Sequence, residues 1–117
     1  MAEQTGSQPF EGRWVAEDPA NAFLFFGPLV EEGQSRPFAN PGQGSLNGSD
    51  GCNGVGGAYE PDGQTATLTR GPSTLKACIG VDTWLRGAAS VRLDGDRLHV
   101  FDHNGEEIGV LTRASED

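Results

Sequence analysis

The fold of this chain is decided by one glycine-rich stretch, Gly48-Ser49-Asp50-Gly51-Cys52-Asn53-Gly54-Val55-Gly56-Gly57-Ala58-Tyr59. Five of its twelve residues are glycine, and glycine loses more backbone freedom on folding than any other residue. Such a concentration is unfavourable unless the backbone adopts positive φ angles or approaches another segment closely. We therefore predict a structural bend, in which Asp50 and Asn53 hydrogen-bond the local backbone.

Downstream of this stretch, the sequence alternates between β-prone segments and Asx-Gly pairs. The pairs are Asp62-Gly63 between 58–59 and 65–69, Asp94-Gly95 between 90–93 and 97–101, and Asn104-Gly105 before 107–113. Asx-Gly pairs favour the tight turns of β-hairpins. The pattern predicts an antiparallel meander over the second half of the chain.

Two strands are predicted upstream. The first is 12–16, with Trp14 inward, and the second is the aromatic segment 22–26, read as a short buried strand that ends at Gly27-Pro28. Residues 31–47 are polar and rich in Gly, Pro, Asn and Ser, so we expect a loop that contains at most a short edge strand over 44–46.

One short helix is expected over 81–89. Asp82 is its candidate N-cap, and Trp84, Leu85 and Ala88 fall on one face. The predicted fold is therefore mainly β (α+β): a single curved, partly closed antiparallel sheet or barrel wrapped around this helix.

Composition limits the function. The chain has 117 residues, which indicates one domain, and its net charge is −9, with 8 basic against 17 acidic residues. Nucleic-acid binding depends on clustered Lys and Arg, so no nucleic-acid partner is expected. No apolar run reaches the roughly 20 residues of a membrane-spanning helix, and we expect a monomer.

The N-terminal residues lack the basic and apolar regions of a secretion signal. Two localisations stay open: cytoplasmic if Met1 is the native start, or exported or in the cell envelope with the leader removed. Segments 1–10 and 115–117 are expected to be disordered, which leaves 11–114 as the folded domain.

Several motifs together resemble the META domain, the HslJ-like heat-shock family. They are Gly51-Cys52-Asn53, Gly57-Ala58-Tyr59, Thr74-Leu75-Lys76-Ala77-Cys78, Gly12 with Trp14, Gly95-Asp96 with Leu98, and Asn104-Gly105. The resemblance covers roughly residues 12 to 113. Lys76 stands where the family usually has Met, Asp82 where a Glu usually opens the helix, and Ala88 where a larger residue is usual.

This resemblance implies a curved antiparallel sheet, partly closed around one helix. It also implies a role in stress or antibiotic tolerance, without an established enzymatic activity. The family fold is similar to that of secretin pilotins, which bind lipid. We therefore expect a non-enzymatic domain that binds an unknown protein partner, with a small apolar-ligand or lipid carrier as the alternative.

The state of the two cysteines is left open by the sequence. If Cys52 and Cys78 pair, the closed loop stabilises the fold by roughly 3.5 kcal/mol on the chain-entropy estimate. The alternative is two reduced thiols that pack as small apolar groups. Cys52 has no cationic neighbour in sequence to lower the pKa of its thiol, so a nucleophilic role is not favoured.

Metal and cofactor sites are not indicated. Cys52, Cys78, His99 and His103 carry suitable ligand atoms, but no pair has the close Cys-x₂₋₄-Cys spacing of structural zinc sites. The carboxylates Asp94, Asp96 and Asp102 lie in or beside turns, where Asp is common for structural reasons. We expect no catalytic residues and no cofactor.

One apolar site is considered. A partly closed sheet can leave a cleft, and its candidate lining residues are Phe23, Phe25, Trp84 and Phe101. The alternative is that these aromatic side chains fill the core, as is usual in barrels of this size.

Overall fold

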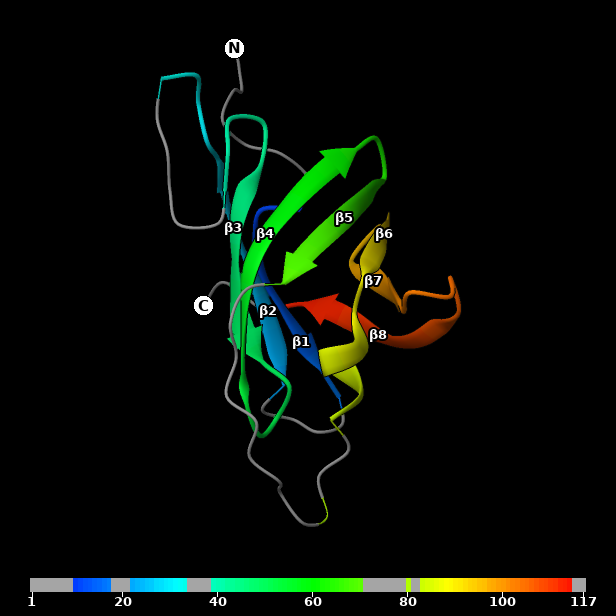
Figure 1. Cartoon of the computed structure of the whole chain (residues 1–117). Helices are drawn as coiled ribbons and strands as arrows, with labels where there is room; N and C mark the ends of the chain where they lie inside the picture. Colours follow the sequence, from blue (N-terminus) through cyan, green and yellow to red (C-terminus); the bar gives the residue numbers. More distant parts are fainter. Residues whose placement is uncertain (1–9, 18–21, 34–38, 71–79, 81–82, 115–117) are drawn as a thin grey trace.

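The computed structural model describes residues 10–17, 22–33, 39–70, 80 and 83–114 (Figure 1). Nearly all of the regular structure in this part of the chain is β. The elements are β1 (Gly12–Ala16), β2 (Phe23–Leu29), β3 (Gly44–Ser49), β4 (Gly54–Asp62), β5 (Thr65–Arg70), the 3-10 helix η1 (Trp84–Gly87), β6 (Ser90–Asp94), β7 (Arg97–Phe101) and β8 (Glu107–Arg113).

The strands form a closed antiparallel barrel in which each strand pairs with the next in sequence and β8 returns to β1. Closure rests on three residue pairs between β1 and β8, among them Trp14 with Arg113 and Ala16 with Leu111. The predicted antiparallel sheet is confirmed, but it is fully rather than partly closed. Among the described strands closure leaves no edge, since each of them has two neighbours.

Alternation along the strands places one apolar face inside the barrel. In β1 the inward residues Trp14 and Ala16 are buried while Arg13 is exposed, and in β7 Leu98 and Val100 are buried between more exposed neighbours. This period of two is what a strand imposes on its side chains. The interior is thus filled by large side chains, of which Trp14, Tyr59, Phe10 and Phe26 are the bulkiest that are fully buried.

The glycine-rich stretch is a β-hairpin rather than an irregular bend. Its first residues belong to β3 and its last to β4, and only 50–53 form the turn. Gly51 has φ of 99° in this turn, a conformation that favours glycine. Gly48 serves a different purpose: a Cβ there would collide with the carbonyl oxygen of Phe23 on β2.

Two predicted boundaries are wrong. β2 continues through Gly27-Pro28 to Leu29, with a shift of register between Phe26 and Leu29. The predicted loop, 31–47, contains the first four residues of β3, which continues to Ser49. β3 is not an edge strand, because it pairs with β2 on one side and with β4 on the other. Polar and glycine-rich composition therefore concealed a central strand.

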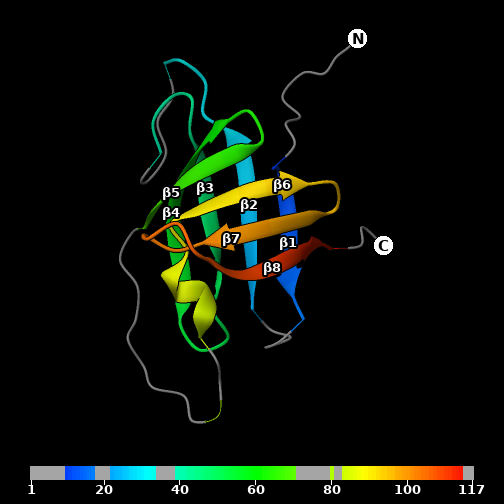
Figure 2. The same cartoon turned by 90° about the vertical axis from the view of Figure 1, so that its right-hand side faces the viewer.

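The predicted helix over 81–89 is also not found in the described residues. They contain only the four-residue 3-10 helix η1, preceded by Thr83, and Asp82 lies outside the described part of the chain. The sheet does not wrap around this helix. Figure 2 shows η1 at one end of the barrel, below β7 and β8, where Leu85 is fully buried and joins the core.

The opposite end of the barrel is closed by aromatic residues. Phe10 belongs to the segment predicted to be disordered, 1–10, but it is fully buried and stacks against Phe26, with ring centroids 6.0 Å apart. The Trp14 indole N–H donates to the Phe10 carbonyl at 2.9 Å. None of the helices in the described part of the chain is long and apolar enough to pass through a membrane.

Candidate functional site

The motif around Asp50 is a structural turn. The Asp50 side chain is 1% exposed, and its Oδ1 accepts from the backbone N–H groups of Cys52 at 2.8 Å and Asn53 at 2.6 Å. The Asp50 N–H donates to the Asn53 carbonyl at 3.0 Å, which closes the hairpin. The carboxylate thus satisfies two backbone donors that the turn would otherwise leave buried.

Tyr59, the aromatic residue of the Gly57-x-Tyr59 motif, also has a structural role. Its ring lies over Gly44 on the neighbouring strand β3, where any Cβ would collide with it. Its hydroxyl donates to the backbone carbonyl of Gly27 on β2. One side chain thereby links β2, β3 and β4 inside the barrel, since a buried hydroxyl needs a hydrogen-bond partner.

The cysteine motif is only partly described. Cys52 lies in the β3–β4 turn and is not a free thiol. Thr74 and Cys78 lie outside the described residues, so the pairing of Cys52 with Cys78 stays a prediction. The turn that holds Cys52 lies at the η1 end of the barrel (Figure 1).

The four aromatic residues considered for an apolar cleft are not brought together. Phe23 and Phe25 point outward from β2, and Phe25 is 43% exposed. Trp84 packs against the core instead, over Gly109 of β8, where a Cβ would lie 2.5 Å from its ring. Phe101 lies on β7 beside Arg92, whose guanidinium carbon is 5.9 Å from the centre of its ring.

Phe23 and Phe25 do form an outer surface with β1. Arg13 pairs with Phe25 across the two strands, and its guanidinium carbon lies 4.4 Å from the centre of the Phe23 ring. We call Arg13, Phe23 and Phe25 the Phe25 patch. Phe25 is the large hydrophobic side chain that the described residues leave exposed, and aromatic residues and Arg are enriched in protein-binding surfaces.

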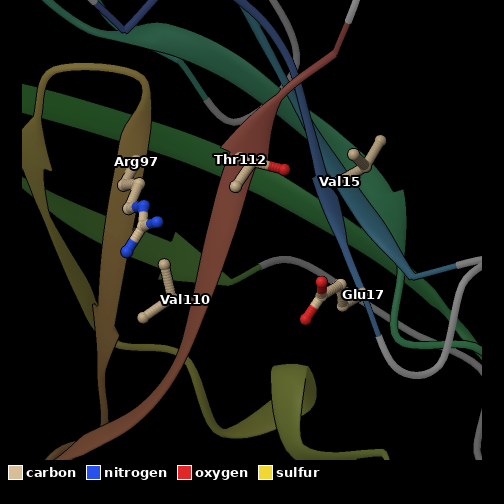
Figure 3. Close-up of a pocket in the computed structure, with 5 residues that line it drawn as sticks. All are labelled: Val15, Glu17, Arg97, Val110 and Thr112. Atoms are coloured by element: carbon tan, nitrogen blue, oxygen red, sulfur yellow. The ribbon is translucent and has the colours of Figure 1, made fainter.

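A hollow of about 200 Å³ lies next to this patch, on the outer face of β1, β8 and β7. Its lining residues are Val15, Glu17, Arg97, Val110 and Thr112. Figure 3 shows Arg97 and Val110 on one side of the hollow and Glu17 and Val15 on the other, with Thr112 on the strand between them. Nothing in the local sequence indicated this site, because it exists only once β8 has paired with β1.

His99 lies at the other margin of this face. Its ring nitrogens are 3.2 Å from a Glu107 oxygen and 3.4 Å from an Asp94 oxygen. His103 is exposed in the turn before β8. In the described part of the chain, no three His, Cys, Asp or Glu side chains are arranged to hold a metal ion. The His99 ring lies between the surface carboxylates of Asp94 and Glu107.

The fold and these sites define a small antiparallel β-barrel with large buried side chains inside. The Phe25 patch and the hollow lie on its outer face. The sequence model of the META domain family matches residues 11–115. The chain belongs to the META domain family. No curated protein and no solved structure matches it.

Proposed function

We propose that this META domain is a non-enzymatic binding domain that holds a protein partner against the Phe25 patch. The observation that carries the proposal is the exposure of Phe25, 43%, beside the stacked pair of Arg13 and Phe23. Covering the exposed Phe25 ring with a partner's surface would remove apolar area from water, which favours binding. Aromatic residues and Arg supply much of the binding energy in protein interfaces.

The chemistry of the named polar residues supports a non-catalytic role. The Asp50 carboxylate is occupied by two backbone donors, and Cys52 is not a free thiol. His99 lies between two carboxylates rather than beside a serine or cysteine. A nucleophilic enzyme needs a nucleophile within hydrogen-bond reach of its base.

The alternative of an apolar-ligand or lipid carrier gains no such support. A carrier of this kind would need a cavity inside the barrel, and the described core residues fill that space with side chains such as Trp14, Tyr59 and Phe26. The aromatic residues considered for the cleft lie on different faces. We therefore retain protein binding as the proposed function.

A role in stress or antibiotic tolerance is part of the same proposal and rests on membership of the family. We further propose that Cys52 pairs with Cys78, since Cys52 is not a free thiol and the chain has two cysteines. Such a bond would fix the β3–β4 turn in a domain that works as a rigid binding surface.

The test is partner capture from stressed cells of the source organism, with cross-linking, by the full chain and by the Phe25→Ser variant. We expect a partner that binds the wild type and is lost from the variant. The matched control is Phe101→Ser, which removes a partly exposed aromatic side chain of β7 that lies beside Arg92 of β6. A partner that survives Phe25→Ser, or that Phe101→Ser removes equally, would contradict the proposal.

A further inference from the structure

The hollow on the outer face has a regular construction. Val15 of β1 pairs with Thr112 of β8, and Thr112 pairs with Arg97 of β7, so these three side chains stand in one row across three strands. Val110 lies two residues from Thr112 on β8, and so on the same face. Glu17, the residue directly after β1, also lines the hollow (Figure 3). The hollow therefore has an apolar pair, Val15 and Val110, between an arginine and a glutamate.

The two charged side chains of the hollow are not neutralised by each other. Among the described residues, neither Arg97 nor Glu17 has a side-chain hydrogen bond or an ion pair. β7 and β1 are two strand spacings apart, roughly 10 Å, with β8 between them. Asp94, which pairs with Arg97 across β6 and β7, directs a carboxylate oxygen toward His99 instead.

A ligand that carries both a negative and a positive group matches this pair of charged side chains best. The guanidinium of Arg97 offers paired donors that match a carboxylate, while the Glu17 carboxylate accepts from an ammonium group. A simple anion would be repelled by the net charge of −9, and a simple cation would leave Arg97 unpaired. A neutral molecule with both charges satisfies both groups and places its aliphatic part against Val15 and Val110.

We propose that this hollow binds a small zwitterion of the amino-acid type, with its carboxylate on Arg97 and its ammonium on Glu17. The hollow of about 200 Å³ is smaller than the roughly 300–1,000 Å³ of pockets for drug-sized ligands. It suits a free amino acid with a short aliphatic side chain, or a zwitterionic dipeptide. The site does not include the Phe25 patch and stands independently of the protein partner proposed above.

The proposal is tested by NMR titration of the full ¹⁵N-labelled chain with L-valine at low ionic strength. We expect the amide signals of Val15, Val110 and Thr112 to shift in a saturable manner. Isovalerate lacks the ammonium and isobutylamine lacks the carboxylate, so each should bind about tenfold more weakly, as expected for loss of a charged hydrogen bond. Comparison of L-valine with the dipeptide Val-Val then shows which zwitterion, free amino acid or peptide, fits better.

Two variants locate the binding. Arg97→Gln and Glu17→Gln should each weaken L-valine binding about tenfold, and both positions are exposed, so the fold is preserved. The matched controls, Arg92→Gln and Glu31→Gln, alter exposed residues outside the hollow and should leave binding unchanged. The proposal is overturned if the shifts map elsewhere, if Arg97→Gln or Glu17→Gln binds like the wild type, or if isovalerate binds as tightly as L-valine.

Discussion

The two ends of the barrel are closed in different ways. At one end, which we call the aromatic end, Phe10 packs against Phe26 and Tyr59, whose rings also contact each other. The Arg113 guanidinium carbon lies 4.2 Å from the centre of the Trp14 ring at this end. An Arg113 N–H also donates to the Glu11 carbonyl at 3.1 Å. At the other, the η1 end, Leu85 and Trp84 enter from a single 3-10 turn, next to the turn that holds Cys52.

The two ends of the barrel are stabilised by different interactions. The aromatic end gains its stability from burial of large rings supplied by β2, β4 and the residues just before β1. The η1 end depends on four helical residues, too few for a stable helix in isolation, and on a glycine that leaves room for Trp84. We therefore expect the aromatic end to resist opening through packing, and the η1 end to need a further restraint.

The largest effect is expected at the aromatic end. Phe10→Ala removes a fully buried ring and should lower the free energy of unfolding by about 3–5 kcal/mol, as measured by urea denaturation. The control Phe25→Ala truncates an exposed ring of the same size and should change stability by less than about 1 kcal/mol. A similar small loss in both variants would mean that Phe10 does not close the barrel.

The next effect concerns the proposed restraint at the η1 end. If Cys52 and Cys78 are bonded, the double variant Cys52→Ser/Cys78→Ser should lose about 3.5 kcal/mol of stability. Hydrogen exchange should accelerate in the β3–β4 turn and η1 before it accelerates around Tyr59. Mass spectrometry after alkylation, with and without reduction, checks the bond itself; two thiols that alkylate without reduction would contradict the prediction.

A smaller effect is expected from Gly109→Ala, which also acts at the η1 end. The new Cβ would lie 2.5 Å from the Trp84 ring, so Trp84 must move, at a cost of about 1–3 kcal/mol. A red shift of tryptophan fluorescence should accompany the loss. Gly87→Ala is the control, because its Cβ would make only an ordinary 3.6 Å contact with Ile108; equal stability of the two variants would show that Trp84 is not held there.

The smallest effect is expected from Tyr59→Phe at the aromatic end. The ring and its contacts with Phe26 remain, but the hydrogen bond to the Gly27 carbonyl is lost. Denaturation should show a loss of about 1 kcal/mol, well below that of Phe10→Ala. A loss as large as that of Phe10→Ala would mean that the hydroxyl, rather than ring packing, secures this end.

Local patterns were sufficient for most of the strands. Gly63, Gly95 and Gly105 lie in the connections that the Asx-Gly pairs predicted, with positive φ of 67°, 62° and 82°, because such turns depend on neighbouring residues alone. Asp62 and Asp94 are the last residues of β4 and β6. The first strand and the inward position of Trp14 followed from alternation. The prediction for Asp50 as a brace of the local backbone is confirmed, for the same local reason.

Other features had no local signal. A single Phe10 after a polar segment shows no periodicity, so its burial depends on Phe26 and Tyr59, which lie far along the chain. The glycines and polar residues of β3 suggested a loop, yet Gly44 and Gly48 are strand residues that make room for Tyr59 and for the backbone of β2. In the segment predicted to be a helix, the described residues, 83–89, are helical only from Trp84 to Gly87.

The antiparallel β character, the hairpin turns and membership of the META domain family follow from the amino-acid sequence, because turn chemistry and the motif Gly51-Cys52-Asn53 are carried by residues close together in the chain. Closure of the barrel and the hollow between Arg97 and Glu17 depend on the tertiary structure, because they arise only when β8 pairs with β1. That contact joins segments nearly a whole chain apart, and no local pattern specifies its register. The burial of Phe10 also depends on the tertiary structure, because it requires contact with Phe26 and Tyr59 on β2 and β4.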